Sequence, residues 1–147
     1  MSNLYTKKFT GRSGRRLAYR LAYGCDLMEA LQAIVEDSQV RFGSINFLGS
    51  VLRAKLGYYQ MHEKRWLTLE LDKAMEILSG LGNVSLKDDK PFVHAHLTLL
   101  DSEGKVHGGH LLPGCTVFAG EVFVDEIDIE TPPRRVYDPV TGLTLWE

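Results

Sequence analysis

The stretch that most constrains the fold is a pair of strand-like segments joined by a short turn, residues 91–112, which read PFVHAHLTLLDSEGKVHGGHLL. Side chains alternate between the two faces of a β-strand, so His94 and His96 share one face. The positions on the opposite face of this strand are all apolar, namely Val93, Ala95, Leu97 and Leu99. The alternation predicts a strand with one face against a hydrophobic core, and it leaves the histidine face free to line a site.

The turn between the two segments, residues 101–104 (DSEG), sets their register. Asp at its first position and Gly at its last are typical of a type I turn that closes a three-residue hairpin loop with a bulge. This turn pairs Asp101 with Lys105, and counting outward places His96 opposite His110 on the histidine face. A shift of one residue would turn His110 toward the core instead, because the faces of a strand alternate.

Three imidazoles on neighbouring strands form a donor set that suits Zn²⁺ or another divalent ion, and we therefore identify His94, His96 and His110 as candidate metal ligands. Three protein ligands leave one coordination position for water or a small-molecule ligand. Gly108 and Gly109 fit a place where a larger side chain would block that position. The alternative is a strand whose histidines face solvent or form local hydrogen bonds.

Two further histidines and both cysteines carry weaker signals. His62 and His107 have no partner in the strand pattern, and we expect both to lie on the surface. Cys115 is expected to be a small buried residue. Cys25 precedes a helix start, where the thiolate is favoured, yet we expect it to be inert. Two cysteines make no disulfide framework.

Length and composition restrict the class of protein. A chain of 147 residues with 44% hydrophobic and 24% charged residues predicts one globular domain with its own core. The net charge of −2 gives no general attraction to nucleic acid or to anionic membranes. No apolar run is long enough for a signal peptide or a membrane span, so we expect a reduced, cytoplasmic protein without membrane contact.

The rest of the chain predicts one helix among many strands. Asp26 and Glu29 form a capping box that starts a helix over residues 27–38. Strand patterns occupy residues 16–23, 44–52, 54–61, 66–71 and 116–129. Two stretches are less regular: residues 74–84, whose second half we assign to a strand, and the polar turn at 86–91. The sum is an α+β fold, a mostly antiparallel β-sheet of about seven strands packed with one main α-helix.

The two ends differ in composition from the middle. Residues 1–14 are predicted to be a mobile N-terminal segment, with basic residues that favour either a nucleic-acid arm or a solvated terminus. Residues 15–129 form the predicted domain. Residues 130–147 contain Pro132-Pro133 but end on apolar side chains, so we expect a docking tail that packs on its own core or on a neighbouring subunit.

With these motifs in order, the sequence resembles the PPC domain, the "plants and prokaryotes conserved" domain, over roughly residues 17–129. The residues that carry the resemblance are Gly24-Cys25-Asp26-Leu27, Gly43-Ser44-Ile45, Gly49, Tyr58-Tyr59, Glu76-Ile77-Leu78-Ser79, Gly82-Asn83-Val84-Ser85, His94-Ala95-His96-Leu97-Thr98 and Gly108-Gly109-His110-Leu111. The run that ends in His-x-His and Gly-Gly-His is a specific combination.

The resemblance implies an α+β domain that assembles as a homotrimer. In plants such domains follow an AT-hook in nuclear DNA-binding proteins and serve mainly protein association, whereas bacterial members stand alone and are labelled DNA-binding by analogy. This chain has no AT-hook. The family is also distantly similar to acetolactate decarboxylase, whose zinc is held by an equivalent His-x-His and Gly-Gly-His. By position, this likeness implies the same three ligands, His94, His96 and His110.

Three functions remain open at this stage. The first is a stand-alone, homotrimeric PPC module with a DNA-binding or regulatory role and a three-histidine zinc or other divalent metal site. The second is a metal-dependent enzyme on a small keto or hydroxy acid. Glu76 and Glu121 are candidates for its acid or base or for a fourth metal ligand, and Arg53 for holding a carboxylate, but the sequence assigns no catalytic residue. The third is a trimeric scaffold with structural histidines. Family position also brings Asn83 and Ser85 near the site.

Overall fold

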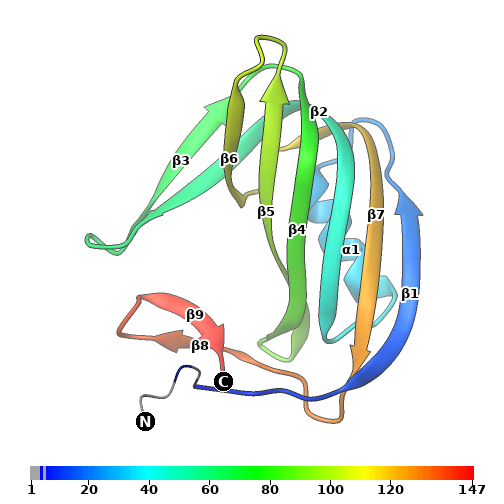
Figure 1. Ribbon diagram of the computed structural model, residues 1–147, viewed down its shortest axis with the longest axis vertical. Coiled ribbons are helices and arrows are strands. Elements are labelled where there is room, and N and C mark those ends of the chain that lie inside the picture. The colour runs from blue at the N-terminus through cyan, green and yellow to red at the C-terminus, as the bar shows by residue number, and fades with distance from the viewer. Residues whose placement is uncertain (1–3, 5) are drawn as a thin grey trace.

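The computed structural model describes residue 4 and residues 6–147, and Figure 1 shows a curved sheet with one helix behind it. The elements are, in chain order, β1 (Arg12–Arg20), α1 (Leu27–Asp37), β2 (Gly43–Gln60), β3 (Arg65–Leu71), β4 (Met75–Lys87), β5 (Lys90–Asp101), β6 (Val106–Leu111), β7 (Thr116–Asp128), β8 (Arg135–Asp138) and β9 (Leu143–Trp146).

The first seven strands form one sheet in the order β1-β7-β2-β4-β5-β6, with β3 beside β2, and its neighbouring strands pair antiparallel. The predicted α+β class, with about seven mostly antiparallel strands and one main helix, is confirmed. Strand β1 begins at Arg12, inside the segment 1–14 that was predicted to be mobile. Residues 1–3 and 5 of that segment lie outside the described residues. In the described part of the chain, no helix is long and apolar enough to cross a membrane.

Helix α1 starts where the sequence predicts. The Glu29 backbone N–H donates to Asp26 Oδ1 over 3.1 Å, which satisfies one of the free amides of the first turn. The other carboxylate oxygen of Asp26 accepts from the Gly114 N–H at 2.6 Å, so the cap also joins the helix to the segment before β7. The buried stripe of the helix consists of Leu27, Leu31, Ile34 and Val35.

The core lies between this stripe and one face of the sheet. The alternate positions of β5 that face it are all at most 3% exposed, namely Val93, Ala95, Leu97 and Leu99. The predicted division of β5 into an apolar face and a histidine face is therefore confirmed, because these four side chains are removed from water together.

Two predicted strand boundaries were wrong. The segments 44–52 and 54–61 form one strand, β2, whose bend falls at a bulge near Gly49, a residue with φ of +143°. The ambiguous residues 74–84 are strand throughout, because β4 is paired on both sides, with β2 and with β5. Tertiary pairing here overrides the helix propensity of the run's first half.

The long strand β2 lets the sheet curl back on itself. Its first half pairs with β4 and β7, and its second half pairs with β3. Near its end, Gly57 also pairs with His110 of β6. A side chain at Gly109 would place its Cβ 2.8 Å from the Gly57 carbonyl oxygen, so only glycine allows the two strands to approach this closely.

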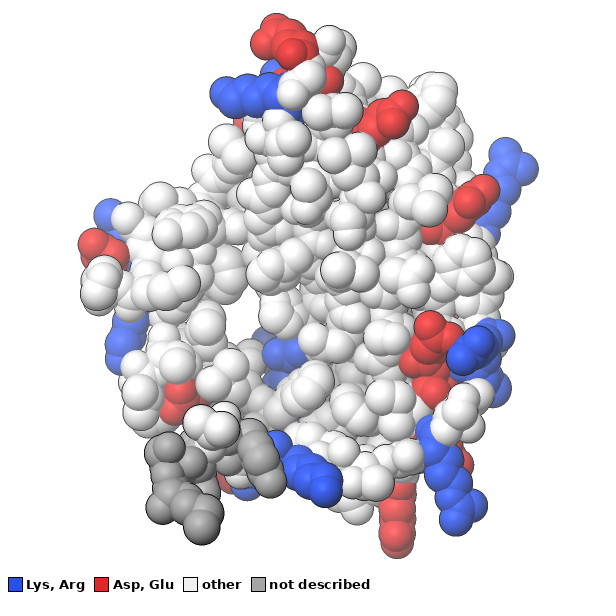
Figure 2. Space-filling model, in the orientation of Figure 1, with Lys and Arg blue, Asp and Glu red and all other residues white. Residues whose placement is uncertain are grey.

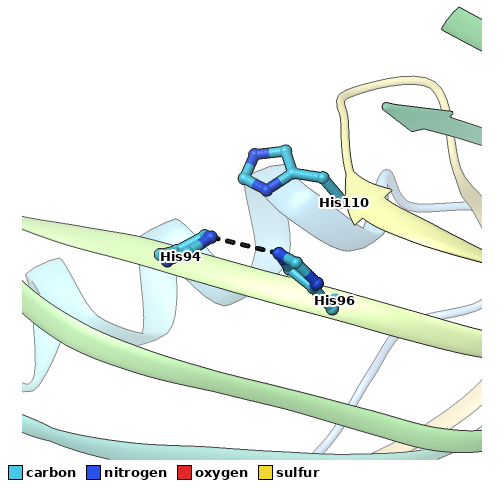
Figure 3. Close-up of side chains that lie close together, drawn as sticks. All are labelled: His94, His96 and His110. Atoms are coloured by element: carbon cyan, nitrogen blue, oxygen red, sulfur yellow. Dashed lines mark hydrogen bonds between the residues drawn. The ribbon is translucent and has the colours of Figure 1, made fainter. Parts of the chain in front are cut away.

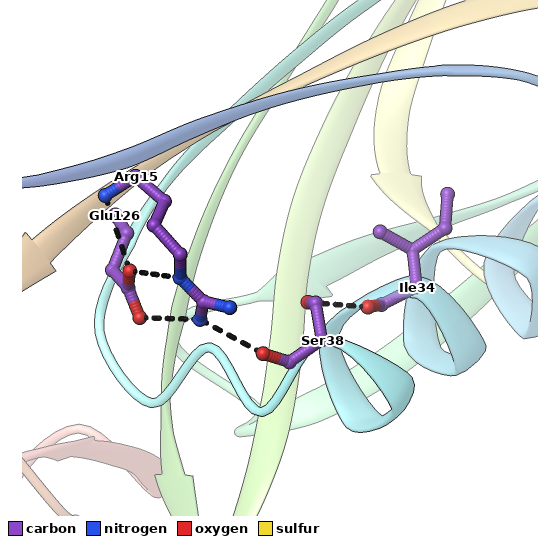
Figure 4. Close-up of polar contacts among 4 residues, drawn as sticks. All are labelled: Arg15, Ile34, Ser38 and Glu126. Atoms are coloured by element: carbon purple, nitrogen blue, oxygen red, sulfur yellow. Dashed lines mark hydrogen bonds and ion pairs between the residues drawn. The ribbon is translucent and has the colours of Figure 1, made fainter.

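Arg15 links three elements. Its guanidinium donates to both carboxylate oxygens of Glu126 on β7, over 2.6 and 2.8 Å, and to the carbonyl oxygen of Ser38 just after α1 (Figure 4). The Ser38 hydroxyl in turn donates to the Ile34 carbonyl. This forked contact fixes the edge strand β1 against both β7 and the end of the helix.

The C-terminal strands β8 and β9 form a separate two-stranded hairpin. The ring of Trp146 packs edge-on against Phe42 at a centroid distance of 5.6 Å. The Tyr59 hydroxyl donates to the Thr141 carbonyl at 2.8 Å, which joins the hairpin turn to the end of β2. In Figure 1 the hairpin lies below the strands β2 and β3 that extend from the sheet.

Candidate functional site

The hairpin of β5 and β6 has the register predicted from its turn. Gly104 has φ of +76°, and the Gly104 N–H donates to the Asp101 carbonyl, as the bulged loop requires. Counting from this turn, Thr98 pairs with Gly108 and His96 pairs with His110. The predicted convergence of the three imidazoles is confirmed, because directly opposite residues project from the same face.

The three rings enclose a common point (Figure 3). The Nε2 atoms of His94 and His96 lie 3.2 Å apart, and each of the three residues offers a nitrogen within 4.8 Å of the others. The ring of His110 stands over the other two, with centroid distances of 4.9 Å to His94 and 5.3 Å to His96. Two strands thus supply three nitrogen donors to one small volume.

Burial holds two of these rings neutral. The pKa of His94 is lowered to about 4 by burial first, and then by the charge of Arg135 and by the neighbouring histidines. Burial, His96 and Arg135 lower the pKa of His110 to about 4 as well. At neutral pH both rings are therefore in the unprotonated form that binds metals.

The donor set fits a divalent metal ion. The Nδ1 atom of His110 is buried and has no hydrogen-bond partner in the described part of the chain, which is unusual for a polar atom out of water. Ligands of a tetrahedral zinc ion at ~2.0–2.1 Å stand about 3.3 Å apart, close to the separation of the His94 and His96 nitrogens. Three imidazoles also suit zinc better than calcium or magnesium, which take oxygen ligands.

Aromatic side chains line one side of the histidines. Trp66 of β3 packs on the His110 ring at 4.8 Å between centroids, and Tyr59 of β2 packs on Trp66 at 5.2 Å. These contacts follow from the curl of the sheet, because the pairing of β2 with both β3 and β6 brings their side chains together. Figure 2 shows the surface hollowed between this strand pair, the C-terminal hairpin and the central sheet.

Arg135, at the start of β8, is a site residue that the sequence did not reveal. Its Nη2 donates to Asn83 Oδ1 at 2.7 Å and its Nε donates to Ser85 Oγ at 2.9 Å. Asn83 pairs directly with His94, so the guanidinium lies beside the histidine cluster. The family resemblance had placed Asn83 and Ser85 near the site. Their partner Arg135 lies about fifty residues further along the chain, in the tail 130–147, for which the sequence predicted docking but no site residue.

The other sequence candidates lie elsewhere. Glu76, Glu121 and Arg53 are exposed, and the metal-type cluster contains no carboxylate. The Arg53 guanidinium donates to the Thr116 hydroxyl instead. Gly109 faces the core side, where its lack of a side chain lets β6 approach β2 closely. It does not keep the metal position open for a ligand, so the role predicted for it was wrong.

The prediction for His62 is confirmed, since it is exposed, whereas that for His107 was wrong. The His107 side chain is only 9% exposed, and its Nε2 lies 2.8 Å from a carboxylate oxygen of Asp101. Cys115 is buried, and burial raises the pKa of its thiol to about 11. Burial also raises the pKa of Cys25, so its position before the helix does not favour the thiolate.

Three solved structures resemble this chain closely. A metal-containing protein from Archaeoglobus fulgidus is 41% identical, with a TM-score of 0.91 over 97% of this chain and 99% of that one. A plant- and prokaryote-conserved (PPC) protein from Pyrococcus horikoshii is 35% identical, with a TM-score of 0.87 over 98% and 97%. A protein from Bacteroides thetaiotaomicron, named as a candidate DNA-binding protein, is 26% identical, with a TM-score of 0.83 over 99% and 98%.

Among curated proteins, the bifunctional protein GlmU of two Synechococcus strains is 32% identical over 124 residues, which is 84% of this chain. The chain spans only about a fifth of the length of these relatives. The family model of the Plants and Prokaryotes Conserved (PCC) domain matches residues 8–128. On the strength of that match, which includes the whole seven-stranded sheet and the three histidines, the chain belongs to the Plants and Prokaryotes Conserved domain family, the PPC domain of the sequence resemblance.

Proposed function

We propose that this chain is a metal-binding PPC module in which His94, His96 and His110 hold a divalent ion, with zinc the preferred metal. The observation that carries the proposal is the buried Nδ1 of His110, which has no partner among the described residues and lies beside two further imidazoles. The name of the A. fulgidus relative as a metal-containing protein supports it. When bound, such an ion supplies a Lewis acid with an open coordination position.

Elemental analysis tests the metal site directly. Protein purified in zinc-supplemented buffer should contain about one ion per chain, and His96→Ala should contain less than about a tenth of that. Circular dichroism should show that the variant keeps its strand content. A wild-type protein that carries no metal after supplementation, or a variant that carries as much as the wild type, contradicts the proposal and leaves the histidines as structural residues.

We further propose that the module is a homotrimer, as the family resemblance implies. The outer face of the sheet, away from α1, carries large apolar side chains that are 48–62% exposed, namely Leu48, Leu78, Leu81 and Phe123. An exposed apolar set on several neighbouring strands is typical of a surface that is covered by another chain. Light scattering should give three times the chain mass of 16.5 kDa, and Leu81→Asp should shift the mass toward one chain.

DNA is the candidate macromolecular partner, supported by the name of the B. thetaiotaomicron relative. The charge of this chain favours an indirect role, in which the domain associates with other proteins on DNA. The net charge is −2, and Arg15 and Arg16 of the basic N-terminal run are paired with Glu126 and Asp125. Figure 2 shows basic and acidic side chains interspersed around the rim of the visible face.

An electrophoretic shift at low salt tests this role. We expect retardation of duplex DNA only at high protein concentration, and we expect it to vanish at physiological salt, because few phosphates are neutralised. Tight binding that persists at high salt would show that the domain contacts DNA directly and would contradict the indirect role.

A second candidate function is a metal-dependent enzyme on a small keto or hydroxy acid. The observation that favours it is Arg135 beside the histidines, since a fixed guanidinium is suited to hold a carboxylate. Turnover of any member of a panel of 2-hydroxy-3-keto acids by the zinc-loaded protein, lost in His96→Ala, would support the enzyme. No turnover across the panel would favour the binding module.

A further inference from the structure

The guanidinium of Arg135 is half-buried and lacks a counter-charge. Its three hydrogen bonds all go to neutral oxygens, on Asn83, Ser85 and the Thr144 carbonyl. None of the ion pairs formed among the described residues includes it. Burial of a cation without an anion is costly, and burial lowers the pKa of Arg135 accordingly. A guanidinium has five N–H donors, so two remain for a further acceptor.

The position of this guanidinium is set by the strand register. Its partners Asn83 and Ser85 lie opposite His94 and Phe92 respectively, so it stands on the face of β5 that bears the histidines. Its central carbon lies over the Phe92 ring, 5.4 Å from the ring centroid, in a cation–π contact.

The charges around the site indicate which kind of ligand could fill the open metal position and contact Arg135. Three neutral imidazoles leave the full charge of a divalent ion uncompensated, and Arg135 adds another positive charge beside it. The cluster of candidate ligands contains no Asp or Glu. A species that fills the open metal position and reaches Arg135 must therefore be negatively charged. Trp66 against His110 and Phe92 under Arg135 add apolar walls that suit a carbon skeleton better than a bare inorganic ion.

We propose that Arg135 and the metal together form a binding site for a small organic carboxylate, with the guanidinium fork holding the carboxylate group. This inference rests on the proposed metal site and names the chemical class of its ligand. In this proposal the C-terminal hairpin positions the carboxylate-binding side chain in the site, because Arg135 is the first residue of β8.

The test uses the cobalt(II)-substituted protein, whose visible absorption reports the coordination of the metal. Pyruvate should change the spectrum of the wild type saturably, and its uncharged methyl ester should not. In Arg135→Gln we expect pyruvate affinity to fall at least about tenfold, because a charge-assisted fork is lost, while cobalt content stays the same. Arg135→Lys should be intermediate, because it keeps the charge and loses the fork.

The matched control is Arg134→Gln, which removes the neighbouring arginine, an exposed side chain paired with Asp89. It should bind pyruvate as the wild type does. Absence of bound cobalt in the wild type overturns the metal site and this inference together. Bound cobalt with a response to pyruvate that is unchanged in Arg135→Gln, or equal for the methyl ester, overturns this inference alone. Tighter binding of inorganic phosphate than of pyruvate overturns the assignment to an organic carboxylate.

Discussion

The two faces of the β5–β6 hairpin give His107 and His110, three residues apart on β6, different hydrogen-bonding environments. His107 points toward the core side, where its Nε2 meets a carboxylate oxygen of Asp101 at 2.8 Å. The same oxygen accepts from Lys73 at 2.5 Å, and the other carboxylate oxygen accepts backbone N–H groups of the turn. His110, on the outer face, has a buried nitrogen with no partner.

The difference separates a structural histidine from a candidate ligand. Around Asp101 a carboxylate, a lysine and an imidazole satisfy one another, and the hydrogen bonds from Lys73 and then His107 hold the pKa of Asp101 well below its ordinary value. Around His110, the cluster of candidate ligands among the described residues holds two other imidazoles and no carboxylate, and the nearby charge of Arg135 is positive. A polar group that is buried without a partner is costly, and the proposed metal ion would supply the missing partner on the outer face.

Exchange of His110 for alanine should have the largest effect on the outer face. Zinc affinity should fall by more than about 100-fold, because a three-ligand site becomes a two-ligand site. The unfolding free energy of the metal-free protein should change much less. Competition with a chromophoric chelator measures the first quantity and urea unfolding the second. Retention of zinc by His110→Ala would remove the distinction between the two faces.

Exchange of His107 for alanine should show the reverse pattern. We expect a loss of about 1–3 kcal/mol in unfolding free energy, because a buried hydrogen-bond partner of Asp101 is removed. The content of zinc should equal that of the wild type. Urea unfolding and elemental analysis on one preparation provide both numbers, and a loss of zinc without a loss of stability would mean that the roles of the two histidines are exchanged.

The two faces should also lose stability in different pH windows after removal of metal by a chelator. The pKa values of His94 and His110 are lowered from 6.5 to about 4, so the unfolded chain takes up protons first, and stability falls as pH drops through that range. The pKa of Asp101 is lowered from 3.8, so its contribution is present above that pH and is lost as pH falls further.

Urea unfolding between pH 7 and pH 2, at steps of about half a unit, should resolve these windows. Asp101→Asn should flatten only the acid window, and His110→Ala should flatten only part of the upper one. A single window that neither variant alters would show that other groups control acid unfolding.

The smallest effect is expected for His62→Ala. This histidine is exposed on the turn between β2 and β3, so zinc content and melting temperature should both equal those of the wild type. This variant controls for the loss of one histidine as such, because it removes a histidine that lies outside the cluster. A loss of zinc here would show that metal is bound nonspecifically by surface imidazoles.

Much of the site could be predicted from one segment of the sequence. Alternation placed His94 and His96 together, and the Asp-x-x-Gly turn set the register that brings in His110, because both signals act over a few residues. The same register turns His107 toward the core face, where it meets Asp101 of the same hairpin, so the prediction that it is exposed overlooked a signal that was local. Gly109 was assigned to ligand access, since nothing local shows that β2 crosses there.

The local geometry follows from the amino-acid order alone, namely the start of the helix at Asp26, the alternating faces of β5 and the hairpin that aligns the histidines. These depend on side-chain period, capping and turn chemistry, which are properties of near neighbours in the chain. Packing between distant segments, in contrast, makes β4 a strand throughout, places Trp66 against His110 and brings Arg135 beside His94. Those outcomes depend on pairing and packing between segments that are distant in sequence, where free energy is gained only once the whole sheet has closed.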